Sequence, residues 1–168
     1  HRYSSIYALT YRFLYGVTGM TTKAVHSQTT DNSAAVVGSR SLRVRRVITT
    51  RAGGFSTGRY HGLNLSLDVG DNPVTVAHNR ERLAEKLHLP LERFVYMEQL
   101  QSPHVSVIEA TADTRFTAPI PATDAVVTTA PELALVVLTA DAVPVLLGDD
   151  EAGVIAALHG SPFGIRAG

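Results

Sequence analysis

The chain has 168 residues, 45% of them hydrophobic, which is enough for one domain with a core of its own. Its 15 Lys and Arg residues balance its 15 Asp and Glu residues, so no excess of positive charge predicts a nucleic acid partner. The absence of Cys excludes disulfides, Cys-based zinc sites and thiol nucleophiles.

The first 40 residues predict a leader or a mobile N-terminal segment. Residues 1–19 are rich in Tyr and lack the charged start, clean apolar stretch and cleavage site of a signal peptide. Met20 is a hypothetical start of translation, and residues 21–39 are polar and small, with little to bury. No apolar run reaches the roughly 18–20 residues that span a bilayer. We therefore expect a cytoplasmic protein without a membrane partner, whose compact domain occupies residues 41–168.

A strand and a glycine-rich loop open this domain. β-Branched residues with partial alternation predict a strand over residues 41–50. Its three arginines could touch phosphates, although a solvated strand face explains them without a ligand; they are Arg43, Arg45 and Arg46. The following RAGGFSTGRYHG is expected to be a loop, because four glycines interrupt regular structure and neither a Walker loop nor a GxGxxG motif is present.

One helix is expected, over residues 73–87. Asn72 suits the N-cap and Pro73 suits the first helical position. Apolar residues recur at helical spacing through this range, and Pro90 lies just beyond its end. The preceding NLSLDVGDNP predicts a short strand that ends in turn residues.

The remainder of the chain predicts strands. FVYMEQLQSPHVSVIEA indicates a strand, an interruption at Ser102 and Pro103, and a second strand. Three apolar runs follow, DAVVTT, LALVVLTADAVPVLL and GVIAALH, and such continuous runs are typical of strands buried on both faces. A tight turn is expected over residues 149–153, between the last two runs. One helix among many strands predicts a single α+β domain with mixed β-sheets.

Several motifs follow one another in a recognisable order over residues 47–160. They are TTRAGGFSTGRYHGLNLSLDVGDNP, NRERLAEKL, QLQSPHV, ATDAVVT, LTADAVPVLL and VIAALHG. This series resembles the laccase-domain family, also called YfiH-like or polyphenol-oxidoreductase-type proteins. The resemblance implies an α+β fold with mixed sheets. It also implies a purine nucleoside phosphorylase that deaminates adenosine, cleaves methylthioadenosine and takes a nucleoside and phosphate as small-molecule partners.

Two other activities are attached to the family, an older label of copper-dependent polyphenol oxidation and an editing of peptidoglycan precursors. Members of the family also continue well beyond the last of these motifs. The resemblance therefore implies that residues 41–168 form a laccase domain that is truncated at its C-terminus.

The resemblance further implies an active site built around one metal ion, zinc or copper. The family's ligands are the His of Gln-Val-His-Gly, the Cys of Thr-Ala-Asp-Cys and the His of His-Ala-Gly-Trp-Arg-Gly. These positions hold Gln101, Ala142 and His159, and the family's Trp and Arg become Pro162 and Phe163. A catalytic zinc usually has three protein ligands, whereas Ala offers no lone pair and an amide oxygen suits harder cations. We therefore expect His159 to remain as a metal ligand and the metal to bind poorly.

Two nearby residues offer further donors. His104 lies three positions after Gln101, and odd separations point to opposite faces of a strand, so His104 should not replace Gln101 unless Pro103 disturbs the alternation. Asp141 could form a catalytic pair with His159, or it could only shape the end of a strand. His159 itself is a candidate metal ligand or general acid and base, and the alternative is a hydrogen-bonded His at the end of a buried strand.

The glycine-rich loop carries the remaining candidates. Arg51 could hold a phosphate through two parallel hydrogen bonds, and the alternative is an exposed surface arginine. Ser56 and Asn64 could contact a ribose or a base, whereas polar loop residues usually satisfy turns. Asp68 and Asp71 could act as carboxylate bases, and the alternative is that they cap turns or the helix start.

Two hypotheses of different class follow from these residues. In the first, the chain is a nucleoside-processing enzyme in which phosphate attacks the anomeric carbon or water attacks C6 of adenine. In the second, the chain has lost catalysis and is a binding module or a non-functional fragment, because Gln101 and Ala142 stand where ligands are expected. A third possibility is that these two residues are engineered changes in a normally active enzyme.

Overall fold

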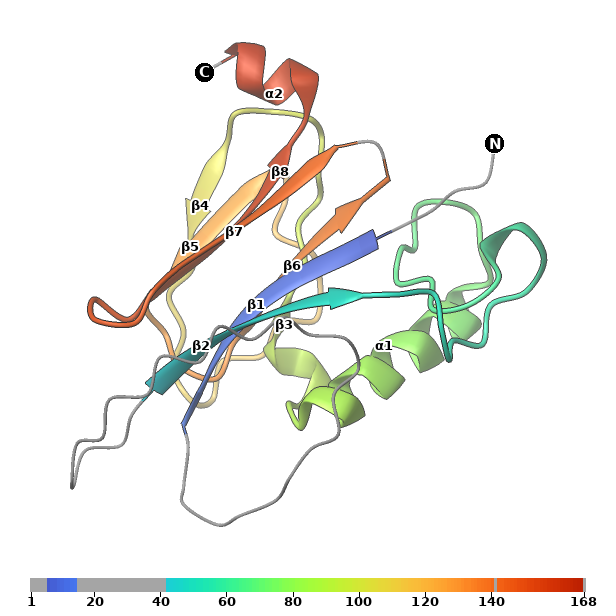
Figure 1. The fold of residues 1–168 in the computed structure, drawn as a ribbon, viewed down its shortest axis with the longest axis horizontal. Helices are drawn as coiled ribbons and strands as arrows, with labels where there is room; N and C mark the ends of the chain where they lie inside the picture. Colours follow the sequence, from blue (N-terminus) through green and yellow to red (C-terminus); the bar gives the residue numbers. More distant parts are fainter. Residues whose placement is uncertain (1–5, 15–41, 141, 168) are drawn as a thin grey trace.

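The computed structural model describes residues 6–14, 42–140 and 142–167, and these form an α+β fold with two four-stranded sheets. Figure 1 shows the two sheets and the long helix α1 (Pro73–Leu87). A hydrophobic cluster lies between α1 and the first sheet, and a second cluster lies between the two sheets. The expected α+β class with mixed sheets is confirmed.

The first sheet has the order β2-β1-β6-β3. Its strands are β2 (Leu42–Thr49), β1 (Ile6–Leu14), β6 (Ala134–Thr139) and β3 (Phe94–Val95). β1 is antiparallel to both of its neighbours, so β2 and β6 run in the same direction and end at the same edge. The register shows that the ends of β2 and β6 lie level with each other on either side of β1, because Tyr7 is paired with both Thr49 and Leu138.

Residues 6–14 hold a different place from the one that sequence analysis gives them. The sequence predicts a leader or mobile segment over the first 40 residues, whereas β1 is an internal strand of the first sheet with a hydrogen-bonded partner on each side. The run IYALTYRFL contains several residues with high strand propensity, and its long separation from β6 hides the pairing from local reasoning. A domain boundary near residue 41 stays a prediction.

The second sheet has the order β4-β5-β8-β7, with β4 parallel to β5 and the other pairs antiparallel. Its strands are β4 (Val105–Val107), β5 (Ala125–Thr128), β8 (Val154–Gly160) and β7 (Val143–Asp149). Its inner face meets the first sheet in a cluster that includes the fully buried Val126, Leu135 and Ala157. Two hydrogen bonds join β2 to the C-terminal end of β7. The Val44 N–H donates to the Asp150 carboxylate, and the Arg46 guanidinium donates to the Gly148 carbonyl.

Helix α1 has the bounds that the sequence predicts. The Asn72 side chain accepts hydrogen bonds from the Val74 and Thr75 N–H groups, and Pro73 occupies the first helical position. The helix ends at Leu87 and is capped by His88, which has a left-handed backbone. Its buried residues Leu83 and Ala84 pack with Phe94, Tyr96, Ala134 and Val136 of the first sheet and its neighbours. None of the helices in the described ranges is long and apolar enough to cross a membrane.

Three expectations about individual elements are wrong. Residues 64–72 form turns and irregular chain in place of a short strand. Asn64 bonds to Ser66 and Asp71 within this segment, and Asp71 also accepts a hydrogen bond from Ser56 of the glycine-rich loop. The run LALVVLTADAVPVLL forms two strands in different sheets, β6 and β7, and β7 is covered on one face only. A second helix, α2 (Pro162–Ala167), follows β8, and two single-turn 3₁₀ helices span Gly58–Tyr60 and Leu91–Arg93.

A buried asparagine of α1 holds the glycine-rich loop. Asn79 is fully buried; its Oδ1 accepts the Phe55 N–H at 2.7 Å, and its Nδ2 donates to Ser56 Oγ at 2.9 Å and to the Asn64 carbonyl at 2.8 Å. The loop passes itself closely, since a Cβ on Gly54 would lie 2.1 Å from the Gly62 carbonyl carbon. The loop therefore has one defined path beside α1.

Replacing Asn79 with Ala should destabilise the protein by about 2–3 kcal/mol, because it leaves several buried polar groups without a partner. The measurement is the free energy of unfolding in urea. Glu85→Ala, at an exposed site on the same helix, should change that energy by less than about 0.5 kcal/mol. Equal effects of the two substitutions would show that Asn79 does not hold the loop.

Candidate functional site

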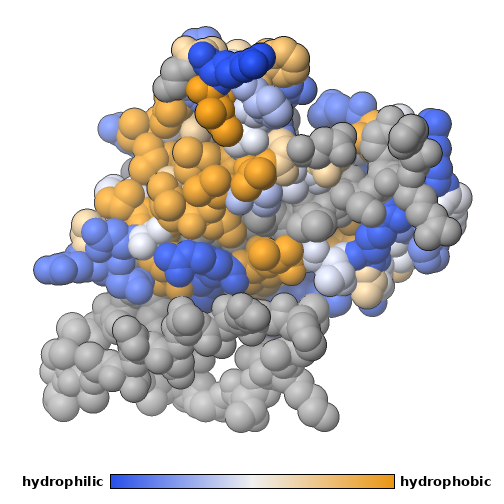
Figure 2. Space-filling view, turned by 45° about the horizontal axis from the view of Figure 1, so that its top comes forward, coloured by the Kyte–Doolittle hydropathy of each residue, from blue (hydrophilic) through white to orange (hydrophobic). Residues whose placement is uncertain are grey.

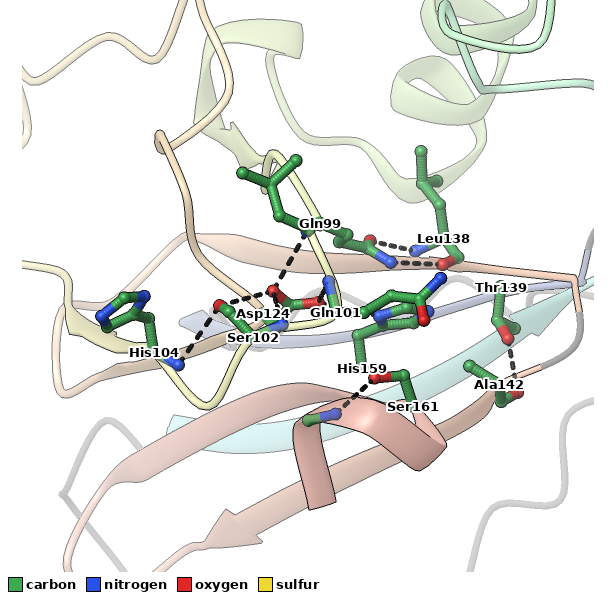
Figure 3. Close-up of polar contacts among 12 residues, drawn as sticks. Gln99, Gln101, Ser102, His104, Asp124, Leu138, Thr139, Ala142, His159 and Ser161 are labelled. Carbon is green, nitrogen blue, oxygen red and sulfur yellow. Dashed lines mark hydrogen bonds and ion pairs between the residues drawn. The ribbon is translucent and has the colours of Figure 1, made fainter. Parts of the chain in front are cut away.

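The candidate site centres on a histidine and a buried aspartate. His159 lies near the end of β8 with its side chain 11% exposed, and its Nδ1 is 2.9 Å from Asp124 Oδ1. The His159 backbone N–H also donates to the Asp124 carbonyl at 2.7 Å. Figure 3 shows this pair with the loop that surrounds it. Side chain and backbone together fix the orientation of the imidazole.

Asp124 directly precedes β5 and is held by five hydrogen bonds. Besides His159, the backbone N–H groups of Leu100, Gln101 and Ser102 donate to its carboxylate, as does the Ser102 hydroxyl. Burial by itself would raise the pKa of Asp124, but the hydrogen bonds from Ser102, His159 and Gln101 outweigh it and hold the pKa below its ordinary value. The carboxylate is therefore ionised at neutral pH.

An ionised Asp124 decides which nitrogen of His159 is available. The carboxylate can only accept a hydrogen bond, so Nδ1 of His159 carries the proton that it donates. In the neutral imidazole, Nε2 then keeps a free lone pair, which can bind a metal ion or accept a proton. After protonation the same atom can donate a proton, and Asp124 stabilises the resulting imidazolium.

The loop that carries Gln101 is fastened to the end of β6. The Gln99 side chain donates to the Leu138 carbonyl at 2.6 Å and accepts the Leu138 N–H at 2.8 Å, as a neighbouring strand would. Gln101 has a left-handed backbone with φ of 60°, which turns its N–H toward Asp124. The Gln101 side chain remains exposed. The loop therefore joins β6 of the first sheet to Asp124 of the second.

The three family ligand positions come together at this place. Ala142 immediately precedes β7, whose Val143 and Pro144 are paired with Gly160 and His159 of β8. Its carbonyl accepts a hydrogen bond from the Thr139 hydroxyl at the end of β6. Figure 3 shows Gln101, Ala142 and His159 around the point where these strands meet. The motif alignment thus corresponds to one location in the fold.

The side chains at this location do not fit zinc or copper. His159 Nε2 is a good donor and is oriented by Asp124 as metal-binding histidines usually are. Gln101 offers only a neutral amide, Ala142 offers none, and such a set falls short of the three ligands of a catalytic zinc. In the described part of the chain, no three His, Asp or Glu side chains are grouped so that they could hold a metal ion.

Neither suggested substitute completes the set. His104 is exposed, and Figure 3 shows it on the far side of the loop from His159. Strand alternation does not decide where His104 points, because residues 101–104 are irregular chain and β4 begins only at Val105. Asp141 lies outside the described residues, and within them Asp124 is the acidic partner of His159.

The glycine-rich loop begins at the same edge of the first sheet, after β2, and carries Arg51, which is partly exposed. Ser56 and Asn64 are 2% and 5% exposed, and both donate to Asp71, at 2.6 and 2.9 Å. Burial would raise the pKa of Asp71, but its hydrogen bonds from Asn64, Ser56 and the Asn72 N–H lower it. These contacts hold the loop together, so Arg51 is the loop candidate that can reach solvent. Asp68 is exposed at a turn.

Asp124 is the functional candidate that sequence reasoning missed. It lies in ATDAVVT, a motif that carries the family resemblance but that by itself indicates no role for the aspartate. The one signal in the sequence that could have identified it is its position, because an aspartate directly before an apolar strand is expected to lie at the edge of the core. Its three loop partners lie more than twenty positions earlier in the chain, at 100–102, so local sequence does not reveal them.

Replacing Asp124 with Asn should destabilise the protein by about 2–4 kcal/mol at pH 7, because several hydrogen bonds to a charged group are weakened or lost. The lowered pKa of Asp124 means that its contribution is complete above the unfolded-state value of about 3.9 and is lost as the pH falls through the folded value. The difference between the two proteins should therefore shrink below about pH 4.

Urea unfolding at pH 7, 5, 4 and 3 measures this difference. Asp113→Asn, at an exposed site, is the matched control and should change the unfolding free energy by less than about 0.5 kcal/mol. A destabilisation by Asp124→Asn that stayed constant over the whole pH range would contradict the role of the ionised carboxylate.

Known proteins resemble this chain over most of its described part. The family model described as multi-copper polyphenol oxidoreductase laccase matches residues 45–167. A protein of Corynebacterium glutamicum named purine nucleoside phosphorylase is 53% identical over 130 residues, which are 77% of this chain and 52% of that protein. A purine nucleoside phosphorylase of Mycobacterium bovis is 44% identical over 131 residues, which are 78% of this chain and 51% of that protein.

Solved structures agree with the sequence relatives. YlmD from Geobacillus stearothermophilus has a TM-score of 0.66 and 34% identity, over 71% of this chain and 46% of that one. YfiH from Bacillus licheniformis has a TM-score of 0.63 and 28% identity, over 70% and 45%. The chain spans about half the length of the curated relatives that it matches. With a match over residues 45–167 and a fold shared with solved structures, the chain belongs to the multi-copper polyphenol oxidoreductase laccase family.

Proposed function

We propose that this chain carries the nucleoside site of a purine nucleoside phosphorylase, with His159 and Asp124 as its acid–base pair. The observation that carries the proposal is the fixed imidazole, whose Nδ1 is bound to a buried carboxylate while Nε2 is available. Relatives up to 53% identical bear the name purine nucleoside phosphorylase, which supports the reaction class.

In the proposed reaction, a phosphate oxygen forms a bond to the anomeric carbon of the ribose. The glycosidic bond breaks, and its electron pair passes to the purine, which takes a proton from the protonated His159 at Nε2. Asp124 stabilises the imidazolium before transfer and keeps Nδ1 protonated afterwards. Arg51 is the candidate for holding the phosphate, since a guanidinium can bind two phosphate oxygens at once.

The same site is proposed for the deamination of adenosine, in which water adds at C6 and ammonia leaves. There, neutral His159 would accept a proton from water at Nε2. No step is assigned to a metal ion, because the donors at Gln101 and Ala142 do not fit one.

The second candidate is a binding module without catalysis. The observation that favours it is again the pair Gln101 and Ala142, which replaces two family ligands while the surrounding loop contacts stay intact. A nucleoside could then be held at the site without turnover. Titration calorimetry with inosine distinguishes the two functions when it is combined with an activity assay.

Incubating the purified chain with inosine and phosphate should release hypoxanthine, and adenosine should give adenine and inosine, all measured by liquid chromatography. His159→Ala should lower the turnover number about 100-fold or more, because it removes the acid–base group. His104→Ala, which changes an exposed histidine of the neighbouring loop, should leave the rate unchanged. Heat of inosine binding without product formation by the wild-type chain would favour the binding module.

Restoring the missing donors should restore metal binding. The double variant Gln101→His and Ala142→Cys should bind about one zinc ion per chain after dialysis, whereas the wild-type chain should retain little, because the variant has three ligands of the right kind. Adding His159→Ala to the double variant should remove the zinc again. Elemental analysis measures all three proteins. Stoichiometric zinc in the wild-type chain would contradict this prediction, because it would mean that residues other than Gln101, Ala142 and His159 bind the ion.

A further inference from the structure

Two positively charged side chains of α1 lie against the glycine-rich loop. Arg82 and Lys86 are about one helical turn apart, so they share one side of α1. A Cβ on Gly53 of the loop would lie 3.8 Å from Arg82 Nη2 and 3.8 Å from Lys86 Nζ. Both charges therefore converge on the same residue of the loop. Figure 2 shows mainly hydrophilic residues along the right-hand edge of the molecule, where this loop lies in Figure 1.

Within the described part of the chain, no carboxylate neutralises these two charges. Neither Arg82 nor Lys86 forms an ion pair or a hydrogen bond with a described residue. Glu81 and Glu85 belong to the same helix, but both are exposed and neither bonds to the two cations. Two like charges that are held together without a counter-charge attract an anion, and this attraction is stronger beside a protein surface than in bulk water.

The guanidinium of Arg82 is held in place by the loop. Its Cζ lies 5.0 Å from the centre of the Phe55 ring, which in turn meets the His78 ring edge to face at 6.4 Å. The Phe55 N–H is bonded to the buried Asn79, so this ring is anchored to the helix. Stacking on a ring positions the guanidinium while its N–H groups stay available, and a positioned donor loses less entropy when a ligand binds.

The loop backbone adds donors at the same place. Gly53 has a left-handed backbone with φ of 77°, and successive N–H groups in such a turn form a concave site for anions. The N–H groups of Ala52 and Phe55 on either side donate to side chains. Those of Gly53 and Gly54 donate to no acceptor among the described residues. Because Gly53 has no side chain, the space between the two cations stays open.

We propose that the side chains of Arg82 and Lys86 and the backbone of Gly53 and Gly54 form a binding site for a phosphate group, which we call the loop site. A phosphate monoanion or dianion carries up to about two negative charges, which match the two cations. Its several oxygens also accept hydrogen bonds from a guanidinium, an ammonium and backbone N–H groups together. The loop site is separate from the phosphate role proposed for Arg51 and does not rest on it.

The phosphate group has two possible sources, inorganic phosphate and a phosphate ester such as a nucleotide. Phe55 separates them, because its ring is 50% exposed beside the loop site and offers a surface on which a base can stack. Inorganic phosphate gains nothing from that ring. Adenosine 5′-monophosphate should therefore bind more tightly than inorganic phosphate if an ester is the ligand, and Phe55→Leu should remove the difference.

Titration with inorganic phosphate at constant ionic strength tests the loop site, with the amide signals of its two glycines followed by nuclear magnetic resonance. These signals should shift and saturate in the wild-type chain. The double variant Arg82→Gln and Lys86→Gln should raise the dissociation constant at least fivefold. The matched control is Arg115→Gln with Arg166→Gln, which removes two exposed positive charges elsewhere and should leave the constant unchanged.

Three outcomes would overturn the proposal. Glycine signals that do not saturate with phosphate or with adenosine 5′-monophosphate show that no site is present, and equal weakening by the two double variants shows attraction to net charge only. Loss of the response in Arg51→Gln, with the double variant at the loop site unchanged, assigns the phosphate to Arg51. Adenosine without a phosphate is the ligand control and should not shift the two glycines. Circular dichroism confirms that each variant is folded.

Discussion

The carboxylate of Asp124 is the contact on which the candidate site depends. It precedes a strand of the second sheet, accepts three consecutive backbone N–H groups from the loop at 100–102, and orients His159. Gln99 fastens the same loop to β6 of the first sheet. One buried charge therefore connects both sheets with the imidazole. Since a buried charge without partners is costly, these contacts depend on one another.

Elements whose stability depends on interactions within one segment could be predicted from the sequence. Helix α1 was predictable to its ends because the N-cap, the proline and the apolar spacing act within the segment itself. Two features were not predictable in this way. β1 is paired with strands far away in sequence, and the break between β6 and β7 separates two sheets rather than two halves of one strand. Apolar runs alone do not reveal which sheet a strand joins.

Some residues of the candidate site could likewise be predicted from the sequence, and others could not. Motif order singled out Gln101, Ala142 and His159, and the structure places all three around the point where β6, β7 and β8 meet, although their role as ligand positions stays a prediction. The polar contacts within the loops were harder, since Ser56 and Asn64 look like ligand-binding residues but are buried and bonded to Asp71. Asp124 was missed because its loop partners and His159 are all distant in sequence. Asp124 orients His159, whereas Gln101 and Ala142 do not offer the donors that a zinc site needs.

The position of β1 has a consequence for where a working polypeptide can begin. Met20 is a tempting first residue, but a chain that started there would lack the strand between β2 and β6. The backbone N–H and C=O groups of β2 and β6 that bond to β1 would then lack these partners. Unpaired backbone groups that are buried destabilise the folded state. The glycine-rich loop follows β2, and Gln99 binds the end of β6. A late start would thus separate the two sides of the site as well as the two sides of the sheet.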